Sequence, residues 1–555
     1  MANLQNSLKK GFLLQQEGKI TEAKRIYQQA LKKAPTDINA LQLLGLIELE
    51  DGAFESAIEL FNKALLSNYE IDHIHLNLAN AYLHLKKYDQ AITHYSKSIQ
   101  LNPKVSKPYY GLGLCYNQLG QWDLAIQNYI YSIQLEPDSF KAYLNLGTCL
   151  EESGMYPAAI ESYDKAIAIK PDYAQAYNNR GNALRELNRL DEALASYDQA
   201  LEIEKGYAQV YNNRGTTLKD LKRFDEAIIS YKKSMEIDPN YQSPHWNLSL
   251  CQLLMGNFAD GWAGYENRWK YENSKLRKYK KEVPQPLWLG EQMLHNQTIL
   301  LYAEQGFGDT IQFSRYVPMV HQLGARVILE VQTPLLGLFQ HLENMCELIP
   351  QGTEIQDFDY QCPLMSLPLA FKTDLETIPA PQGCIQVPQI KLQQWGNALK
   401  AKTKPRVGIV WSGSSSHLND LHRSLSLEKL IPYLPQNAQY FSLQREHRES
   451  DQRTLANHPE ITHFGALLED FSDTAALCEL MDIVISVDTS VAHLAGTIGK
   501  PTWVLLPYTP DWRWLLDRKD SPWYPSMQLF RQKNLGDWDS ALQPLQSALE
   551  NFNVP

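Results

Sequence analysis

The first half of the chain alternates apolar and polar positions with the period of amphipathic helices, and this pattern itself repeats every 34 residues. The clearest two copies are AYNNRGNAL (176–184) and VYNNRGTTL (210–218). A small residue recurs in seven consecutive copies, at Ala23, Ala57, Ala91, Ala125, Ala159, Ala193 and Ala227. An aromatic residue follows each by four positions, at Tyr27, Phe61, Tyr95, Tyr129, Tyr163, Tyr197 and Tyr231. This spacing predicts seven helix-turn-helix units.

The residue types explain how each unit would pack. The alanine lets two helices approach closely, and the aromatic ring fills the space between them. Prolines that end the second helix recur at Pro35, Pro103, Pro137, Pro171 and Pro239. The period and residue types resemble the tetratricopeptide repeat, so residues 1–241 are expected to form a superhelix of seven such repeats.

An eighth copy begins at HWNLSLCQLL (245–254) and then loses the pattern, with Gly261 in the alanine register. Residues 242–283 are therefore expected to form a degenerate eighth repeat and a connecting helix. A degraded last repeat either docks onto another domain or simply caps the array.

An asparagine recurs at the sixth position of the repeat, with Gly111 interrupting the series. The members are Asn77, Asn145, Asn179, Asn213 and Asn247. Stacked repeats would align these amides on the inner helices as a ladder of donors and acceptors. Such a ladder could bind the backbone of an extended peptide, which makes these residues candidates for acceptor binding. Asparagine equally suits the packing of such repeats, and the pattern does not separate the two interpretations.

Short apolar runs replace the helical period after KYENSKLRKYKKE (270–282). QTILLYAEQ (297–305) and ARVILEV (325–331) predict buried strands, with a helix starting at DTIQFSRYVPMV (309–320) between them. The proline-rich PAPQGCIQVPQ (379–389) predicts a linker. Further strands are predicted at PRVGIVWSG (405–413), AQYFSLQ (438–444), DIVISVD (482–488) and PTWVLLP (501–507). We therefore expect two α/β lobes with parallel sheets, at 284–390 and 391–555, and a ligand site at strand carboxyl ends between them.

Composition narrows the class of protein. A chain of 555 residues is too long for one core, and its net charge of −11 argues against nucleic-acid binding, which needs a basic face. Its seven cysteines form no C-x-x-C pair, so neither a zinc ribbon nor a disulfide framework is expected. No run has the apolar character of a signal peptide or the length of a membrane span. We expect a cytoplasmic protein.

Four polar segments follow predicted strands. They are GFGDT (306–310), WSGSSSHLNDLHRS (411–424), VDTSVAHLAG (487–496) and LPYTPDWRWLLDRKDSPWYP (506–525). The glycine-aspartate pair after the first strand and the D-T-x-x-x-H-L-A stretch resemble signatures of the heptosyltransferase-like GT-B glycosyltransferases. With the repeats, the whole chain is similar to the repeat-bearing protein glycosyltransferases, such as O-GlcNAc transferase and bacterial flagellin-modifying transferases. The resemblance implies a two-lobed GT-B domain that uses a nucleotide-sugar as donor substrate and needs no cofactor.

The resemblance assigns the donor phosphate to the helix that opens after Asp488. Free backbone N–H groups and the positive end of the helix dipole suit an anion. Thr489 and Ser490 would contact the phosphate, His493 would lie one turn further in, and Asp488 would accept sugar hydroxyls. The structural alternative is that Asp488 or Ser490 caps the helix and His493 is a buried histidine.

The loop after residue 410 holds further donor-binding candidates. Arg423 would offset the charge of the leaving phosphate, although the family commonly has lysine here and His422 competes for the role. Ser412 and Gly413 would let the backbone approach the phosphate. The alternative is an exposed polar loop.

The aromatic segment after residue 506 supplies the last donor candidates. Trp512 and Trp514 would stack on the base, and Arg513 would lie near the phosphate or the sugar. The alternative is that these tryptophans anchor a loop.

GFGDT lacks the G-K-[ST] of a phosphate-binding loop and has Ile311 at the place of a third dinucleotide-fold glycine. Gly306 and Gly308 are therefore expected to clear space. In the resembled family the matching aspartate, here Asp309, is the general base that acts on the acceptor. Asp309 can also cap the following helix. The two D-x-D strings, DFD (357–359) and DWD (537–539), close no convincing strand, so no metal site is predicted.

These patterns together predict a metal-independent, inverting glycosyltransferase that modifies a hydroxyl of a protein recruited by the repeats. The alternatives are a non-enzymatic scaffold with a degenerate GT-B domain and a transferase for a lipid or polysaccharide acceptor. The first lobe, from Gln297 to the linker, is short for a GT-B half. Either the degenerate repeat around Trp262 and Trp269 completes the acceptor site, or the lobe is inactive.

Overall fold

The computed structural model describes residues 2–271, 280–355, 357–381, 383–399, 401–415 and 420–552. Parts of three segments named above, 272–279, 382 and 416–419, lie outside the described residues. The contacts divide the chain into two compact units, Met1–Thr217 and Leu218–Pro555. In the described residues, no helix combines the length and the apolar character needed to cross a bilayer.

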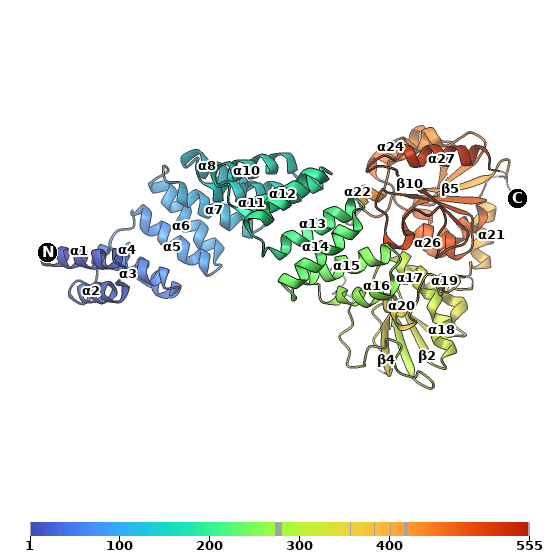
Figure 1. The fold of residues 1–555 in the computed structure, drawn as a ribbon, viewed down its shortest axis with the longest axis horizontal. Helices are drawn as coiled ribbons and strands as arrows, with labels where there is room; N and C mark the ends of the chain where they lie inside the picture. Colours follow the sequence, from blue (N-terminus) through green and yellow to red (C-terminus); the bar gives the residue numbers. More distant parts are fainter. Residues whose placement is uncertain are drawn as a thin grey trace. The chain divides into compact units, whose positions relative to one another are not determined.

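The first unit is a series of paired helices, which confirms the predicted repeats (Figure 1). Its helices are α1 (Ala2–Gln16), α2 (Ile20–Lys33), α3 (Ile38–Glu50), α4 (Phe54–Ser67), α5 (Asp72–His84), α6 (Tyr88–Leu101), α7 (Ser106–Gln118), α8 (Trp122–Leu135), α9 (Phe140–Glu152), α10 (Tyr156–Ile169), α11 (Ala174–Glu186), α12 (Leu190–Ile203) and most of α13 (Ala208–Asp220). A Cβ atom on Gly147 would lie 2.5 Å from Cε1 of Tyr163, so the ring needs glycine beneath it. The aromatic and small positions of the 34-residue period thus form the helix-helix contacts.

The second unit begins with the end of α13 and continues through further helices into the predicted α/β region. These helices are α14 (Phe224–Ile237), α15 (Gln242–Leu254), α16 (Phe258–Tyr265) and the 3-10 turn η1 (Glu266–Trp269). The degenerate eighth copy is therefore a helix pair, α15 and α16, whose second helix has only eight residues. The Trp262 indole N–H donates to the carbonyl oxygen of Thr373 at 3.1 Å, which ties this pair to the first α/β lobe.

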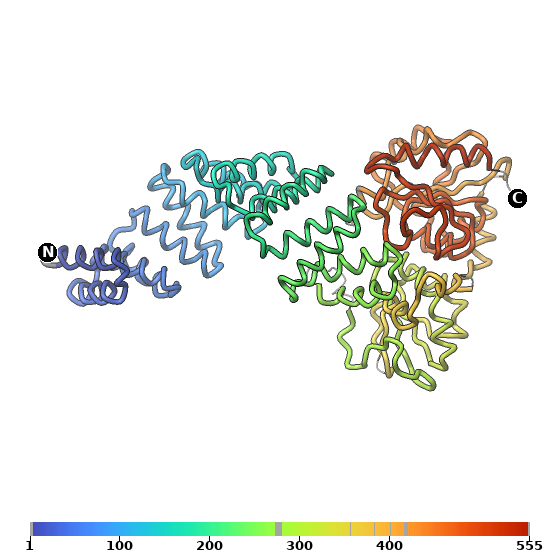
Figure 2. Tube along the Cα trace, in the orientation of Figure 1, coloured from blue at the N-terminus to red at the C-terminus, as the bar shows by residue number. Residues whose placement is uncertain are grey.

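The first lobe has a four-stranded parallel sheet in the order β3-β2-β1-β4. Its strands are β1 (Thr298–Tyr302), β2 (Arg326–Val331), β3 (Cys346–Pro350) and β4 (Tyr360–Pro363). The helices between them are α17 (Phe307–Phe313), the 3-10 turn η3 (Ser314–Tyr316), α18 (Val317–Gln322), α19 (Leu336–Phe339) and, after β4, α20 (Leu367–Ala370). The chain then passes through the linker to the second lobe, from yellow to orange in Figure 2.

The second lobe has a six-stranded parallel sheet in the order β10-β9-β8-β5-β6-β7. Its strands are β5 (Arg406–Val410), β6 (Gln439–Ser442), β7 (Ile461–His463), β8 (Ile483–Val487), β9 (Thr502–Leu506) and β10 (Met527–Arg531). Its main helices are α21 (Gln389–Ala398), α22 (Asp420–Arg423), α23 (Leu427–Leu430), α24 (Glu449–Asn457), α25 (Phe471–Leu480), α26 (Ser490–Thr497) and α27 (Asp539–Glu550). Side chains of α23, α24 and α27 form one core with the sheet, whereas α25 and α26 contribute to another.

Each sheet has one point at which the strand order reverses. β1 pairs with β2 on one side and β4 on the other, and β5 likewise lies between β6 and β8. In open parallel sheets, ligands bind at the carboxyl ends of strands at such a point. The topology therefore predicts ligand binding at the loops after β1 and β4 in the first lobe and after β5 and β8 in the second.

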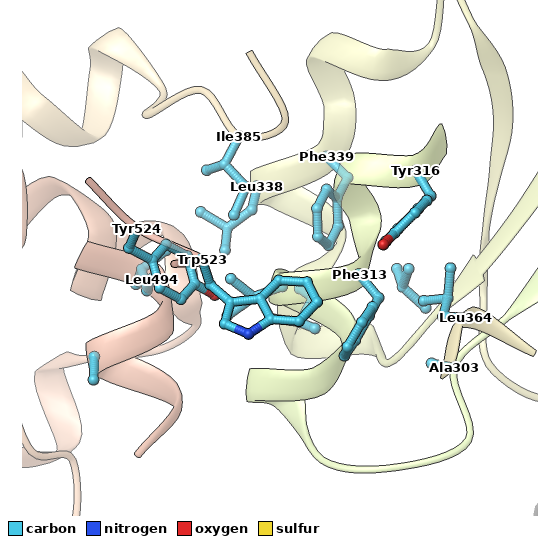
Figure 3. Packing of buried hydrophobic residues seen from close by; sticks show 14 of the residues in the cluster. Ala303, Phe313, Tyr316, Leu338, Phe339, Leu364, Ile385, Leu494, Trp523 and Tyr524 are labelled. Atoms are coloured by element: carbon cyan, nitrogen blue, oxygen red, sulfur yellow. The ribbon is translucent and has the colours of Figure 1, made fainter. Parts of the chain in front are cut away.

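A single hydrophobic core includes residues of both lobes and of the eighth repeat. Trp523 of the second lobe lies 5.7 Å from Phe313 of the first, measured between ring centroids (Figure 3). Trp262 of α16 contacts Trp512 at 5.1 Å. The eighth repeat and both lobes thus pack as one body within the second unit.

Candidate functional site

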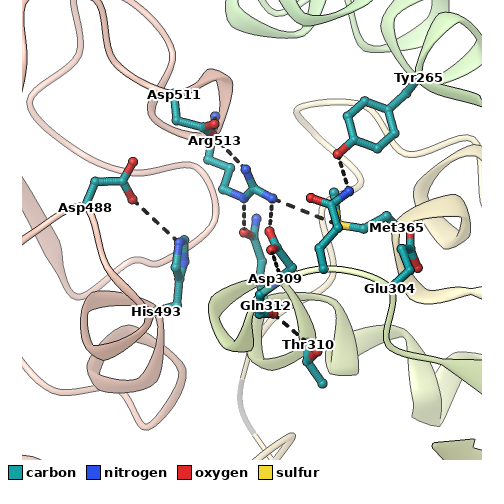
Figure 4. Close-up of polar contacts among 12 residues, drawn as sticks. Tyr265, Glu304, Asp309, Thr310, Gln312, Met365, Asp488, His493, Asp511 and Arg513 are labelled. Atoms are coloured by element: carbon teal, nitrogen blue, oxygen red, sulfur yellow. Dashed lines mark hydrogen bonds and ion pairs between the residues drawn. The ribbon is translucent and has the colours of Figure 1, made fainter. Parts of the chain in front are cut away.

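Asp309, which follows β1 of the first lobe, forms an ion pair with Arg513, which follows β9 of the second lobe (Figure 4). Asp309 lies in the first turn of α17, where its Oδ2 accepts from the backbone N–H of Gly306 at 2.9 Å. Its Oδ1 pairs with Nη2 of Arg513. The same guanidinium donates to Asp511 at 2.8 Å and to Gln312 at 2.7 Å. The capping role of Asp309 is therefore present, together with a contact between the lobes.

Gly308 is required by the approach of α17 to α26. A Cβ atom at this position would lie 2.8 Å from Cδ2 of His493 and 3.4 Å from Cα of Ser490. At Gly306 the nearest atom to such a Cβ is Oδ2 of Asp309, at 3.3 Å. The two glycines thus differ: Gly308 clears space for the other lobe, as expected, and Gly306 has more room.

His493 is buried between the lobes and is held in its neutral form. Its Nδ1 hydrogen-bonds to the Tyr524 hydroxyl at 3.0 Å, whereas its Nε2 lies 3.8 Å from Oδ1 of Asp488, too far for a hydrogen bond. Burial lowers the pKa of His493 well below its ordinary value, and nearby arginines, Arg513 first, lower it further. A neutral imidazole can donate or accept a hydrogen bond here, but it supplies no positive charge.

Asp488 follows β8 and is also largely buried, with 15% of its side chain exposed. Burial raises the pKa of Asp488 to about 6, the Asp511 carboxylate adds to this shift, and Arg423 opposes it. The carboxyl therefore changes its charge near neutral pH, a property that is common at functional sites.

The first turn of α26 is open. Thr489 occupies the N-cap position without capping the helix, because its hydroxyl hydrogen-bonds to that of Ser486 at 3.0 Å. Neither Asp488 nor Ser490 is the N-cap residue, so the capping part of the structural alternative is wrong, whereas His493 is buried as that alternative expected. Uncapped backbone N–H groups and the helix dipole make this end of α26 suitable for an anion.

Arg423 joins the loops after β5 and β8. Its Nη1 donates to the carbonyl oxygen of Asp488 at 3.0 Å. A Cβ on Gly413 would lie 2.4 Å from Nη2 of Arg423, so glycine allows the guanidinium to pass. His422 is exposed. Ser412 is buried, and its hydroxyl accepts from the Gln444 amide at 3.1 Å.

Trp512 and Trp514 of the last segment are buried against protein. Trp512 packs on Trp262, and the Arg513 guanidinium lies 4.2 Å above its ring. Trp514 stacks on His493 with centroids 5.4 Å apart. These contacts are those of the loop-anchoring alternative, with Arg513 as the polar group that the segment brings to the lobe junction.

The asparagine series is half-buried, and several members bond from repeat to repeat. Asn145 donates to the Tyr110 hydroxyl at 2.9 Å. Asn213 donates to Asn178 at 3.0 Å and to Asn182 at 3.1 Å. Asn179 accepts from its neighbour Asn178 at 3.2 Å. Asn77 also lies in the first unit and Asn247 in the second. The amides contribute to repeat packing while part of each side chain remains accessible.

Sequence reasoning overlooked two members of this site, Asp511 and Gln312. Asp511 lies two residues before Arg513 in a segment already singled out, and Gln312 lies one helical turn after Asp309. Gln312 lies three residues after Asp309, a spacing that places both side chains on one face of a helix, and this could have identified it from the sequence. Among the described residues, no group of three or more His, Cys, Asp or Glu side chains is arranged to hold a metal ion.

Comparisons with known proteins support the repeats. Tetratricopeptide-repeat family models match residues 14–72, 74–105 and, in overlapping windows, 104–172, 138–206 and 172–240. Protein FlbA of Caulobacter vibrioides is 24% identical over 327 residues, 54% of this chain and 54% of FlbA. The chain thus spans about half the length of this curated relative.

Two solved structures illustrate the likeness of the helical part. YrrB, described as a TPR protein with an unusual peptide-binding site, is 23% identical, with a TM-score of 0.31 over 33% of this chain and 95% of YrrB. MamA is 29% identical, with a TM-score of 0.29 over 30% of this chain and 97% of MamA. The family models and the sheet topology together show tetratricopeptide repeats followed by a region of parallel sheets.

Proposed function

We propose that this protein is a cytoplasmic GT-B glycosyltransferase that transfers a sugar from a nucleotide-sugar to a hydroxyl of a protein bound by its repeats. One observation carries the proposal. The strand-order reversals of two parallel sheets face each other, and the residues after β1, β5, β8 and β9 meet there through Asp309, Arg423, Asp488 and Arg513. Ligand-binding crevices of α/β proteins are found at such positions.

The second lobe would bind the donor. Its phosphate would accept hydrogen bonds from the open first turn of α26, at Thr489 and Ser490, with Arg423 offsetting its charge. Asp488 would accept hydroxyl groups of the sugar. Ser412 and Gly413 would line the approach beside Arg423.

The first lobe would supply the general base. Asp309 would take the proton from the acceptor hydroxyl while its oxygen bonds to the anomeric carbon. The bond from that carbon to the donor phosphate would break, and its electron pair would leave with the phosphate. Attack opposite the leaving group inverts the anomeric centre. Because Arg513 pairs with Asp309, a bound phosphate would compete for the guanidinium and release the carboxylate for this step.

A screen of the full chain tests this function. Thermal unfolding would be followed with UDP-, GDP-, dTDP- and CMP-linked sugars and with the free nucleotides. A donor present at a hundredfold excess over its Kd should stabilise the fold by about 2.7 kcal/mol. If no nucleotide or nucleotide-sugar shifts the transition and none is hydrolysed, the scaffold alternative replaces the proposal. With a labelled sugar, label in lipid or polysaccharide instead of protein would favour the other acceptor class.

A further inference from the structure

We infer that the degenerate eighth repeat is part of the catalytic unit, with Tyr265 and Arg268 as positioning residues that hold the turn carrying Asp309. The role given to Asp309 rests on the proposed function. The contacts themselves do not depend on it.

Tyr265 is the eighth member of the aromatic series, 34 residues after Tyr231. In four regular repeats, the tyrosine hydroxyl donates to a side chain of its own repeat. The observed pairs are Tyr27 with Gln15, Tyr95 with Asn80, Tyr163 with Glu151 and Tyr197 with Asn182. These partners lie 12 or 15 residues before the tyrosine. The matching positions for Tyr265 are Leu253 and Leu250, which offer no side-chain acceptor.

The register 16 residues before Tyr265 holds a serine where most repeats hold a glycine. In several regular repeats the ring lies on that glycine, where a Cβ would lie 2.5 to 2.6 Å from a ring carbon, at Gly11, Gly45, Gly113, Gly147 and Gly181. The eighth repeat has Ser249 at this position, as the third has Ala79. Tyr265 also packs on Trp246, with ring centroids 4.7 Å apart, as Tyr129 packs on Tyr110 at 5.8 Å. The hydrogen-bond partner of Tyr265 therefore distinguishes it from the series, and not the place of its ring.

The Tyr265 hydroxyl contacts the turn that carries Asp309, the proposed base. The Gln305 side-chain amide donates to the Tyr265 hydroxyl at 2.8 Å, and Tyr265 is 2% exposed. Gln305 directly precedes Gly306, whose N–H binds Asp309. The carbonyl oxygen of Gln305 accepts from Gln332 at 2.9 Å, so the residue is held from two sides.

Arg268 also departs from the repeat pattern, and it too contacts the first lobe. Its register holds a buried alanine or serine in each regular repeat: Ala30, Ala64, Ser98, Ser132, Ala166, Ala200 and Ser234. Because α16 ends at Tyr265 and continues as a 3-10 turn, the long side chain of Arg268 can leave the repeat. Its Nη2 donates to Glu304 at 2.9 Å and to Ser366 at 2.7 Å. The guanidinium thus bridges the residues that follow β1 and β4, at the strand-order reversal of the first lobe.

The Arg268–Glu304 pair is fully buried, with side-chain exposures of 0% for both. Burial raises the pKa of Glu304 to about 8, while Arg268 opposes the shift. A buried pair of this kind is seldom worth more to stability than apolar residues of the same volume. The position of the ion pair explains its presence better than stability does. Glu304 is next to Gln305, so the pair fixes the start of the turn that carries Asp309.

Tyr265 and Arg268, three residues apart on one helical face, therefore hold the consecutive residues Glu304 and Gln305. The Tyr265 hydroxyl contacts this turn instead of a side chain of its own repeat. Arg268 stands where the other repeats have a small residue, and it bonds to the same turn. The eighth repeat thus sets the position of the turn.

The test compares Tyr265→Phe with Tyr163→Phe in the full chain. Both changes remove one hydroxyl that hydrogen-bonds to a buried or half-buried side chain, but only the first lies near Asp309. In Tyr265→Phe, backbone amides of residues 303–312 should exchange with deuterium about five- to tenfold faster, as expected for the loss of one hydrogen bond. Exchange there should not change in Tyr163→Phe. This measurement needs no ligand, so it decides the contact even if no sugar donor is found.

A kinetic measurement then tests the catalytic meaning, with the panel member that wild type hydrolyses. Tyr265→Phe and Gln305→Met should each lower kcat about tenfold without changing KM for the donor. The double variant should lose no more than either single one, because both remove the same interaction. Additive losses, or a changed KM alone, would overturn the positioning role, as would normal kcat and exchange in Tyr265→Phe. Arg268→Lys, which keeps the charge but cannot bridge Glu304 and Ser366, should also lower kcat.

Discussion

The Asp309 carboxylate and the Arg513 guanidinium form an ion pair that joins the two α/β lobes, with 21% and 8% of their side chains exposed. The aspartate belongs to the first turn of α17, and the arginine follows β9. Because Asp511 and Gln312 also hold the guanidinium, the pair has a fixed geometry. This ion pair therefore depends both on how the two lobes pack and on the charge state of Asp309, the proposed base.

Gly308 and Gly306 should differ in their tolerance of alanine. Gly308→Ala places a Cβ 2.8 Å from the His493 ring, so we expect a loss of about 1–3 kcal/mol in unfolding free energy. Gly306 has φ of −71°, and its nearest contact would be 3.3 Å, so Gly306→Ala should cost clearly less. Urea unfolding of the two variants measures this. Equal losses would contradict the close approach of α17 to α26.

Asp488 should make folding stability depend on pH in a defined direction. Its pKa of about 6 in the folded protein exceeds the value of about 3.9 for an unfolded aspartate, so the folded state binds more protons between these values. The stabilisation is complete below about pH 4 and is lost as pH rises through about 6. Asp511, Arg423, Arg513 and His493 are the charged or titratable groups that face Asp488.

Asp488→Asn removes this effect, so the variant should be more stable than wild type at pH 8, by up to roughly 3 kcal/mol. The difference between the two proteins should shrink towards pH 4. Thermal unfolding of both across this range gives the measurement. A difference that is constant with pH would show that Asp488 does not titrate in this window.

Asp488 should also distinguish the sugar from the nucleotide. If its carboxylate accepts sugar hydroxyls, Asp488→Ala weakens binding of the nucleotide-sugar by about tenfold and binding of the free nucleotide much less. Isothermal titration with both ligands checks this. Equal changes for the two ligands would remove Asp488 from the sugar contact.

The asparagine series should affect the acceptor and not the donor. Asn145→Ala combined with Asn179→Ala should raise the acceptor KM about tenfold and leave donor hydrolysis unchanged, because two amides are lost from the inner helices. Asn213 is a poorer probe, since its amide bonds to two side chains, Asn178 and Asn182, whereas the Asn145 amide bonds to one. A lower Tm with an unchanged KM would make these asparagines packing residues.

The repeat period and six strands, β1, β2, β5, β6, β8 and β9, could be predicted because each depends on local patterns of small, aromatic and apolar residues. The other strands, β3, β4, β7 and β10, were not predicted from the sequence. The meeting of Gly308 with His493 and of Asp309 with Arg513 could not, because residues about 200 apart come together only through the packing of two sheets. Tyr265 and Arg268 lay between these cases. Their registers were visible in the sequence, but the partners of their side chains depend on how the eighth repeat packs on the first lobe and on the early end of α16.

The turnover of Asp309→Asn tests the central claim most directly. Asparagine keeps the shape and can still accept from Gly306, so donor binding should change little, whereas loss of the ion pair with Arg513 should lower Tm. Loss of a positioned base should lower turnover about 10²- to 10⁴-fold. Asp473→Asn is the matched control, since Asp473 caps α25 through the same kind of contact without facing the site, and it should keep its turnover. If Asp309→Asn transfers sugar at the wild-type rate, Asp309 only caps its helix and the proposed mechanism is wrong.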